Sequence, residues 1–119
     1  MSVGQILAGL ALLAGLGLAG AAWAGADGQK IYADDCAACH QATGLGRPPV
    51  FPALKDDKVV LGPKAAVLAV ILNGRGGMPP WKARLTDADV AAVTTYIRAA
   101  WGGKAAPVTA SDVAAARAR

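Results

Sequence analysis

Glutamate is absent from this 119-residue sequence, and the residue types that most often carry chemistry are scarce. Two cysteines and one histidine leave no second Cys/His cluster for a metal. No segment alternates between apolar and polar residues for long enough to predict a strand, and no internal repeat is present. These absences predict an all-α chain whose chemistry depends on very few side chains.

Charge is also absent from residues 1–26, whereas residues 27–119 contain every Asp, Lys and Arg and carry the whole formal net charge of +4. The apolar run ILAGLALLAGLGLAGAAWA fits a secretory signal with small-residue cleavage sites at Ala22–Ala24 and Ala24–Ala26, although it lacks a basic start. About 20 apolar residues also suffice to cross a bilayer, so an anchor that associates with the membrane through residues 3–26 fits equally well. Both interpretations predict an exported domain.

Three main helices are predicted in the exported part. The first covers residues 28–38 after the N-cap Asp27, the second covers residues 63–73, and the third covers residues 87–101 after the N-cap Thr86. Long loops rich in glycine and proline connect them. Three short helices bury little apolar surface, so we expect a disulfide, a metal or a cofactor to complete the core.

The chain is predicted to comprise three parts. Residues 1–26 form the signal peptide or transmembrane anchor, residues 27–102 form the folded domain, and residues 103–119 form a C-terminal tail. In the tail, Thr109 followed by Asp112 is a capping pattern that favours a short helix. A frayed, solvated end is the alternative.

The pentapeptide CAACH contains both cysteines and the histidine, as Cys36, Cys39 and His40. Cys-x-x-Cys-His is the spacing of covalent haem c attachment, in which each thiol adds to one vinyl group and the imidazole becomes the proximal ligand of the iron. A structural zinc site needs four ligands, and only three are available here. A thioredoxin-like redox pair needs a βαβ unit, for which no strands are predicted. A plain disulfide or a pair of free thiols is the remaining alternative.

A methionine lies in a loop, within the stretch NGRGGMPPW, where neither a helix nor a strand is expected. Apart from the first residue, Met78 is the only methionine. With His40 on one face of a haem iron, a thioether on the other face favours the ferrous state and raises the reduction potential. Gly76 and Gly77 are expected to permit a close backbone approach, and the two following prolines to stiffen the loop. The alternative is that Met78 is an ordinary packing residue.

Together these segments resemble a class I cytochrome c over nearly all of residues 27–102. The similarity is carried by the stretches GQKIYADDCAACHQATGLG, PPVFPAL, NGRGGMPPW and LTDADVAAVTTYIRAAW. It implies a small all-α cytochrome c fold, with three main helices and long loops wrapped around one covalently bound haem c. It also implies that the first and last helices cross, with Gly28, Tyr32 and Tyr96–Ile97 at their contact.

The resemblance further implies that the carbonyl of Pro48 or Pro49 accepts a hydrogen bond from the proximal imidazole. Arg47, Arg75 and Trp81 are candidates for hydrogen bonds to the haem propionates, unless the two arginines are merely solvated surface. The pocket around the haem is expected to be apolar. Its expected lining residues are Val50, Phe51, Leu54, Leu61, Leu68, Leu72 and Leu85.

The expected function is one-electron transfer without catalysis, because His/Met ligation leaves no open position for a substrate. The main interpretation is a carrier between respiratory or dehydrogenase partners in the periplasm, on the outer side of a bacterial inner membrane. The alternative is a fixed haem subunit of a membrane-bound oxidoreductase or oxidase complex, held by its N-terminal helix. A haem enzyme or gas sensor would need an easily displaced Met78, and the flanking glycines and prolines argue against that.

Basic side chains are expected to surround the haem crevice, and they predict redox partners with acidic docking surfaces rather than nucleic acid. An ordinary solvated basic surface is the alternative. The residues concerned are Arg47, Lys64, Arg75, Lys82 and Arg84.

Overall fold

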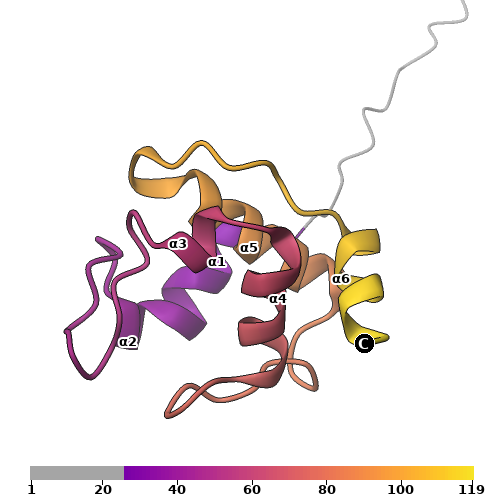
Figure 1. Cartoon of the computed structure of the whole chain (residues 1–119), viewed down its shortest axis with the longest axis horizontal. Coiled ribbons are helices and arrows are strands. Elements are labelled where there is room, and N and C mark those ends of the chain that lie inside the picture. Colours follow the sequence, from indigo (N-terminus) through magenta and orange to yellow (C-terminus); the bar gives the residue numbers. More distant parts are fainter. Residues whose placement is uncertain (1–25) are drawn as a thin grey trace, which may run out of the picture.

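A computed structural model describes residues 26–119 of the chain (Figure 1). The predicted signal or anchor segment falls almost wholly on residues 1–25, which lie outside the described residues. Within residues 26–119, no helix combines the length and the apolar character that crossing a bilayer requires. The expected all-α architecture is confirmed in this part, where the only β-pairing is two isolated bridges, Arg47–Phe51 and Arg75–Met78.

The described part begins with a helical arm made of three consecutive pieces: α1 (Gly28–Ile31), a π-helix (Tyr32–Cys36) and α2 (Ala37–His40). The Asp27 side chain caps the arm by accepting the N–H of Lys30 at 3.1 Å. The helix predicted over residues 28–38 is therefore present, but it continues to the histidine. Its middle turn is wider than an α-turn because the Ala37 N–H bonds to the Tyr32 carbonyl, five residues back.

A long loop leads to two further helices, α3 (Lys58–Leu61) and α4 (Lys64–Asn73). The short α3 is not predicted by the sequence pattern; it begins where the Asp57 carboxylate accepts the N–H groups of Val59 and Val60, each at 2.9 Å. The prediction for α4 is confirmed to within one residue. As expected, α4 ends at a glycine, because Gly74 has a φ of 73°, which L-residues rarely adopt.

The last long helix of the predicted domain is α5 (Asp87–Ala99), followed by a 3₁₀ turn (Ala100–Gly102). Its N-terminus has the predicted Thr86 cap, within a capping box shared with Asp89. The predicted end at Trp101 is wrong, because Trp101 has a φ of 53° and leaves the helix. This turn places the indole against Gly44, and its Nε1–H donates to the Ala42 carbonyl at 3.0 Å.

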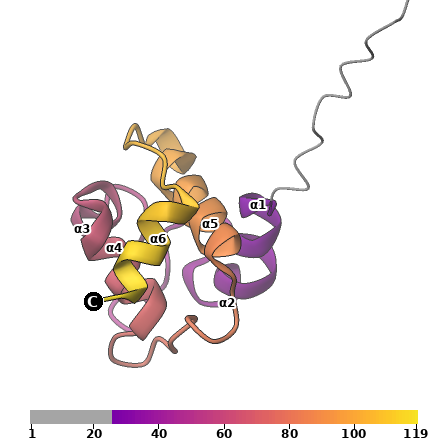
Figure 2. The same cartoon turned by 90° about the vertical axis from the view of Figure 1, so that its right-hand side faces the viewer.

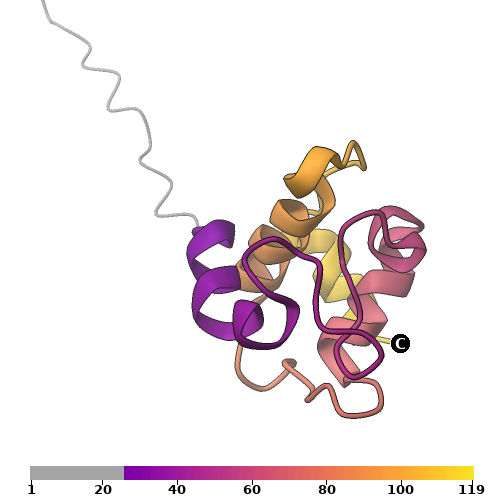
Figure 3. The ribbon, with the colours of Figure 1, turned by 90° about the vertical axis from the view of Figure 1, so that its left-hand side faces the viewer.

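The expected crossing of the first and last helices is confirmed, and Figure 3 shows α1 packed against α5. A Cβ atom at Gly28 would lie 2.2 Å from the carbonyl oxygen of Ala92, so only glycine allows the two backbones to approach this closely. Beside this contact, the rings of Tyr32, Tyr96 and Trp101 form a cluster with centroid separations of 5.4–6.1 Å.

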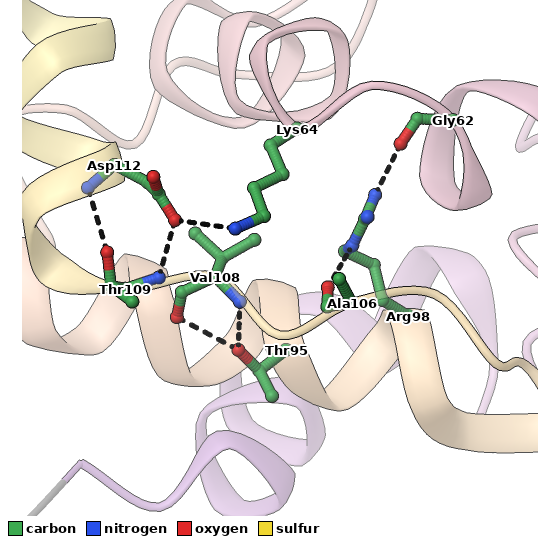
Figure 4. Close-up of polar contacts among 8 residues, drawn as sticks. All are labelled: Gly62, Lys64, Thr95, Arg98, Ala106, Val108, Thr109 and Asp112. Carbon is green, nitrogen blue, oxygen red and sulfur yellow. Dashed lines mark hydrogen bonds and ion pairs between the residues drawn. The ribbon is translucent and has the colours of Figure 1, made fainter.

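The tail predicted for residues 103–119 contains a helix, α6 (Ala110–Arg117), capped by the predicted Thr109–Asp112 box. It is not a frayed end. Val113 is completely buried in the shared core, and the hydroxyl of Thr95 bonds to both the N–H and the carbonyl of Val108 (Figure 4). Lys64 at the start of α4 reaches the Asp112 carboxylate at 3.0 Å.

Arg98 on α5 links the segment before α6 to the turn between α3 and α4. Its guanidinium is almost fully buried and donates to the carbonyls of Val60, Gly62 and Ala106 at 2.7–2.8 Å. Figure 4 shows the contacts with Gly62 and Ala106. These acceptors offset part of the cost of burying a cation. Seen from the side, α5 lies between α1 on one flank and α4 with α6 on the other (Figure 2).

We predict that G28A destabilises the full-length protein by about 1–3 kcal/mol, the usual cost of overpacking a helix contact. The added methyl group has no space between α1 and Ala92, so the helices must separate. Denaturant unfolding measures the change. Q29A alters an exposed side chain on the same turn and should cost no more than about 0.5 kcal/mol; equal losses in both variants would contradict the close crossing.

A second prediction concerns Asp112. The N–H of Thr109, together with Lys64, lowers the pKa of the Asp112 carboxyl below its ordinary value of 3.8. Such a carboxylate adds stability above its unfolded-state pKa, and this contribution is lost as the pH falls through the folded-state pKa. We therefore expect D112N to lower the melting temperature at neutral pH, and the difference from the unmodified protein to disappear below pH 3.8.

The matched control for this prediction is D56N. Asp56 is an exposed aspartate with a φ of 58°, a conformation that asparagine also tolerates. Melting curves of both variants across the same pH series separate the specific contact from the general effect of acid. A D112N deficit that stays constant from neutral to acidic pH would show that the carboxylate charge is not what holds α6.

Candidate functional site

One mostly apolar cavity of about 390 Å³ lies between the helical arm, α4 and the loops that join the helices. Its volume is within the range of about 300–1,000 Å³ that is typical of small-molecule and cofactor sites. The cavity brings together the residues that the sequence singles out as candidate iron ligands and haem attachment points. These residues are Cys36, Cys39, His40 and Met78.

His40 is the last residue of α2 and is only 8% exposed. Its Nδ1 lies 2.9 Å from the carbonyl oxygen of Pro52. A carbonyl can only accept, so Nδ1 carries the proton and the Nε2 lone pair is free to bind a metal. The implied partner, Pro48 or Pro49, is therefore wrong: neither of them lines the cavity.

The reason is the path of the loop after the haem motif. The N–H and the carbonyl of Arg47 bond to the carbonyl and the N–H of Phe51, at 2.8 and 3.0 Å. This bridge closes a turn that contains both earlier prolines and turns the chain back toward the helical arm. It is therefore the next residue, Pro52, whose carbonyl reaches the imidazole.

The two thiols differ in their surroundings. Cys36 is half-buried at the end of the π-helix, Cys39 is exposed, and no disulfide joins them. Burial, helped by nearby Asp35 and by Cys39, raises the pKa of the Cys36 thiol to about 11, so the thiol is protonated at neutral pH. Residues 26–119 contain no cluster of three or more Cys, His or Asp side chains able to hold a metal ion.

The loop that carries Met78 folds back onto the end of α4. Arg75 and Met78 exchange two backbone hydrogen bonds of 3.2 and 3.0 Å, and the N–H of Trp81 donates to the Ile71 carbonyl at 3.0 Å. Within the polypeptide, the backbone is crowded at Gly74, where a Cβ would lie 2.4 Å from the Met78 carbonyl oxygen. Gly77 lines the cavity, and the close approach expected at Gly76 and Gly77 stays a prediction.

Four of the seven residues expected to line the pocket do so: Val50, Phe51, Leu54 and Leu85. Leu61, Leu68 and Leu72 do not. Because α4 is apolar nearly all round, its pattern does not identify the face that meets the cavity. The structure assigns that face to Val67, Val70 and Ile71, whereas Leu68 and Leu72 are buried in the protein core. Apolar side chains that the sequence analysis missed also come from α3 and α5: Val59, Val60, Val93 and Ile97.

The candidate propionate-binding residues separate into two groups. Arg75 and Trp81 line the cavity, whereas Arg47 does not. Arg84, predicted only as one of the basic side chains around the crevice, also lines the cavity. Its guanidinium lies 4.5 Å from the Trp81 ring centroid. Lys64 is not at the cavity, because it is paired with Asp112 near α6.

Comparison with known proteins identifies the family of this chain. A family model described as cytochrome c oxidase, cbb3-type, subunit III matches residues 24–97, which is more than half of the chain. The chain belongs to the cytochrome c family. Its cofactor is accordingly a covalently bound haem c with its iron. The two thiols, the free imidazole nitrogen and the thioether in one mostly apolar cavity fit that group.

The relatives of this cytochrome c domain include subunits of larger enzymes and a small cytochrome. The chain is 40% identical to the cbb3-type cytochrome c oxidase subunit CcoP of Cereibacter sphaeroides, with 66% of this chain and 28% of that protein covered. It is 37% identical to cytochrome c-552 of Thermus thermophilus, with 91% of this chain and 86% of that protein covered. The chain spans less than a third of the length of the first oxidase subunits that it matches.

Solved structures agree with this assignment. The crystal structure of cytochrome cL from Hyphomicrobium denitrificans matches with a TM-score of 0.50 and 25% identity, covering 77% of this chain and 67% of that one. The expected small cytochrome c fold is therefore confirmed for the part of the chain that the structure describes.

Proposed function

We propose that this chain is a one-electron transfer protein that uses a single covalently bound haem c with His/Met axial ligation. The observation that carries the proposal is the convergence of two thiols, one imidazole and one thioether on the same mostly apolar cavity. Haem c supplies the redox chemistry, in which its iron accepts and returns one electron. No side chain is needed as an acid, a base or a nucleophile.

Each residue of the site then has a defined task. Cys36 and Cys39 hold the haem by thioether bonds. His40 binds the iron through Nε2, and its hydrogen bond to the Pro52 carbonyl fixes the tautomer and strengthens its donation. Met78 would supply its thioether sulfur as the second iron ligand. The apolar wall excludes water, and this keeps the reorganisation that accompanies electron transfer small.

The mouth of the cavity offers a docking surface for a redox partner. Arg75 and Arg84 are exposed at the cavity, and Val50, which is 73% exposed, adds an apolar contact. Two arginines beside an exposed valine favour a partner that has acidic residues around its own electron-entry site. Lys64, which was expected among the basic side chains around the crevice, does not contribute to this docking surface because it is paired with Asp112.

The protein could transfer electrons either as a small carrier or as a fixed subunit of a complex, and a different relative supports each role. Cytochrome c-552 matches over most of both chains, which favours a small carrier. The family match and the CcoP similarity favour a fixed subunit of an oxidase complex. We propose the carrier as the main function, in the periplasm or tethered to its membrane, and the oxidase subunit as the second candidate.

The ligand role of Met78 is tested with two variants. M78A and M78L are both expected to give folded, haem-bearing protein whose ferric iron is high-spin. The reduction potential should fall by on the order of 0.1 V, since axial ligands tune haem potentials over about 0.8 V in total. Absorption spectra and redox titration measure both effects.

M78L serves as the packing control, because leucine nearly matches methionine in volume but has no sulfur to donate. If Met78 only fills space, M78L should keep the unmodified spectrum and potential while M78A loses stability. A low-spin spectrum in M78L, with the potential unchanged, would remove Met78 as a ligand.

The attachment and the setting are tested together by the intact mass of the protein purified from a bacterium with cytochrome c maturation. We expect one haem added to the polypeptide, and its loss in the double variant C36S/C39S. A soluble chain that begins near Gly25 supports the carrier, because such a chain retains no anchor. A membrane-bound chain that retains residues 1–25 and copurifies with an oxidase would instead support the subunit.

A further inference from the structure

The last turn of α6 contacts the segment that follows Met78. The guanidinium of Arg117 donates to the carbonyls of Lys82 and Leu85, at 2.5 and 2.7 Å, and pairs with the Asp87 carboxylate at 2.5 Å. One side chain thus joins three points between the methionine loop and the start of α5. Arg117 itself does not line the haem cavity.

On its other side, the same segment is held by α4. The N–H groups of Trp81 and Lys82 donate to the carbonyls of Ile71 and Leu72 at 3.0 and 3.2 Å. The chain leaving Met78 therefore lies between α4 and the Arg117 side chain. Because this segment directly follows Met78 in the chain, we expect its contacts on both sides to resist an outward displacement of Met78.

Arg117 can act in this way only if α6 is itself fixed, and the structure shows three attachments. Val113 is completely buried, Val108 is bonded to Thr95, and Asp112 is paired with Lys64 at the start of α4 (Figure 4). Figure 2 shows α6 lying along α4 and α5, with its C-terminal end on the side of the loop that follows α4. The guanidinium therefore projects from a helix that is anchored independently of the loop.

We propose that Arg117 is a positioning residue that keeps the Met78 loop closed on the haem iron. The inference rests on the proposed ligand role of Met78. In this proposal the C-terminal segment does more than stabilise the fold. It controls how easily a competing ligand replaces the Met78 thioether on the iron. A flexible loop loses more conformational entropy when its ligand binds, so a loosened loop holds Met78 on the iron less tightly.

The experiment uses the full-length, haem-loaded protein and its ferric form, with imidazole as the competing ligand for the position of Met78. We expect R117A to bind imidazole about tenfold more tightly than the unmodified protein, as expected for loss of a hydrogen bond from a charged group. The absorption band of ferric iron with methionine ligation, recorded without imidazole, shows whether the thioether is still bound at the start.

R119A is the matched control. Arg119 carries the same charge near the same end of the chain, is exposed, and makes no side-chain hydrogen bond or ion pair in residues 26–119. Its imidazole affinity should remain within about twofold of the unmodified value. If R117A and R119A bind imidazole equally, the proposal is overturned, even if R117A alone unfolds more easily.

R117K keeps the proposal testable if R117A fails to take up haem. A lysine ammonium retains the charge but cannot match the planar fork that serves three acceptors, so an intermediate affinity is expected. Unmodified affinity in R117K would overturn the proposal. M78A distinguishes failure of the proposed Met78 ligand role from failure of the proposed Arg117 role. If the unmodified protein already binds imidazole as tightly as M78A, Met78 is not an iron ligand.

Discussion

The mostly apolar cavity at the centre of the molecule is the constraint on which the rest of the structure depends. Side chains from the helical arm, α3, α4, α5 and two loops face the same space, and these elements leave about 390 Å³ between them. A second group of buried side chains, including Leu68, Leu72 and Val113, packs away from the cavity. The covalently bound haem c is both the cofactor and a large part of what the helices pack around, and its attachment through thiols suits a protein too small to enclose it fully.

The candidate ligands are held mainly through the backbone. The imidazole of His40 is oriented by a carbonyl that a tight turn delivers, and the loop of Met78 is pinned to the end of α4 by main-chain hydrogen bonds. Two arginines add a second layer, because Arg98 on α5 and Arg117 on α6 bind backbone carbonyls that are distant in sequence. Two arginines thus tie the periphery of the molecule to the loops around the site.

Local chemistry was the most predictable part of this protein. Helix caps depend on a few neighbouring residues, so the Thr86 and Thr109 boxes and the Asp27 cap could be identified directly from the sequence. The CAACH motif and Met78 stood out because their residue types are so rare in this chain that few alternatives compete. The structure brings these residues to one cavity, as expected, while their roles as thioether anchors and axial ligands stay predictions.

By itself, then, the sequence determined the all-α class, the main helices and the set of residues able to bind a haem, because these depend on composition and short-range spacing. Only the tertiary structure decided that Pro52 supports the imidazole, that Val67 and Ile71 rather than Leu68 and Leu72 face the cavity, and that Arg117 binds the segment after Met78. A helix that is apolar all round has no preferred face until its neighbours are in place. Likewise, a carbonyl or a guanidinium finds its partner only after distant segments have packed.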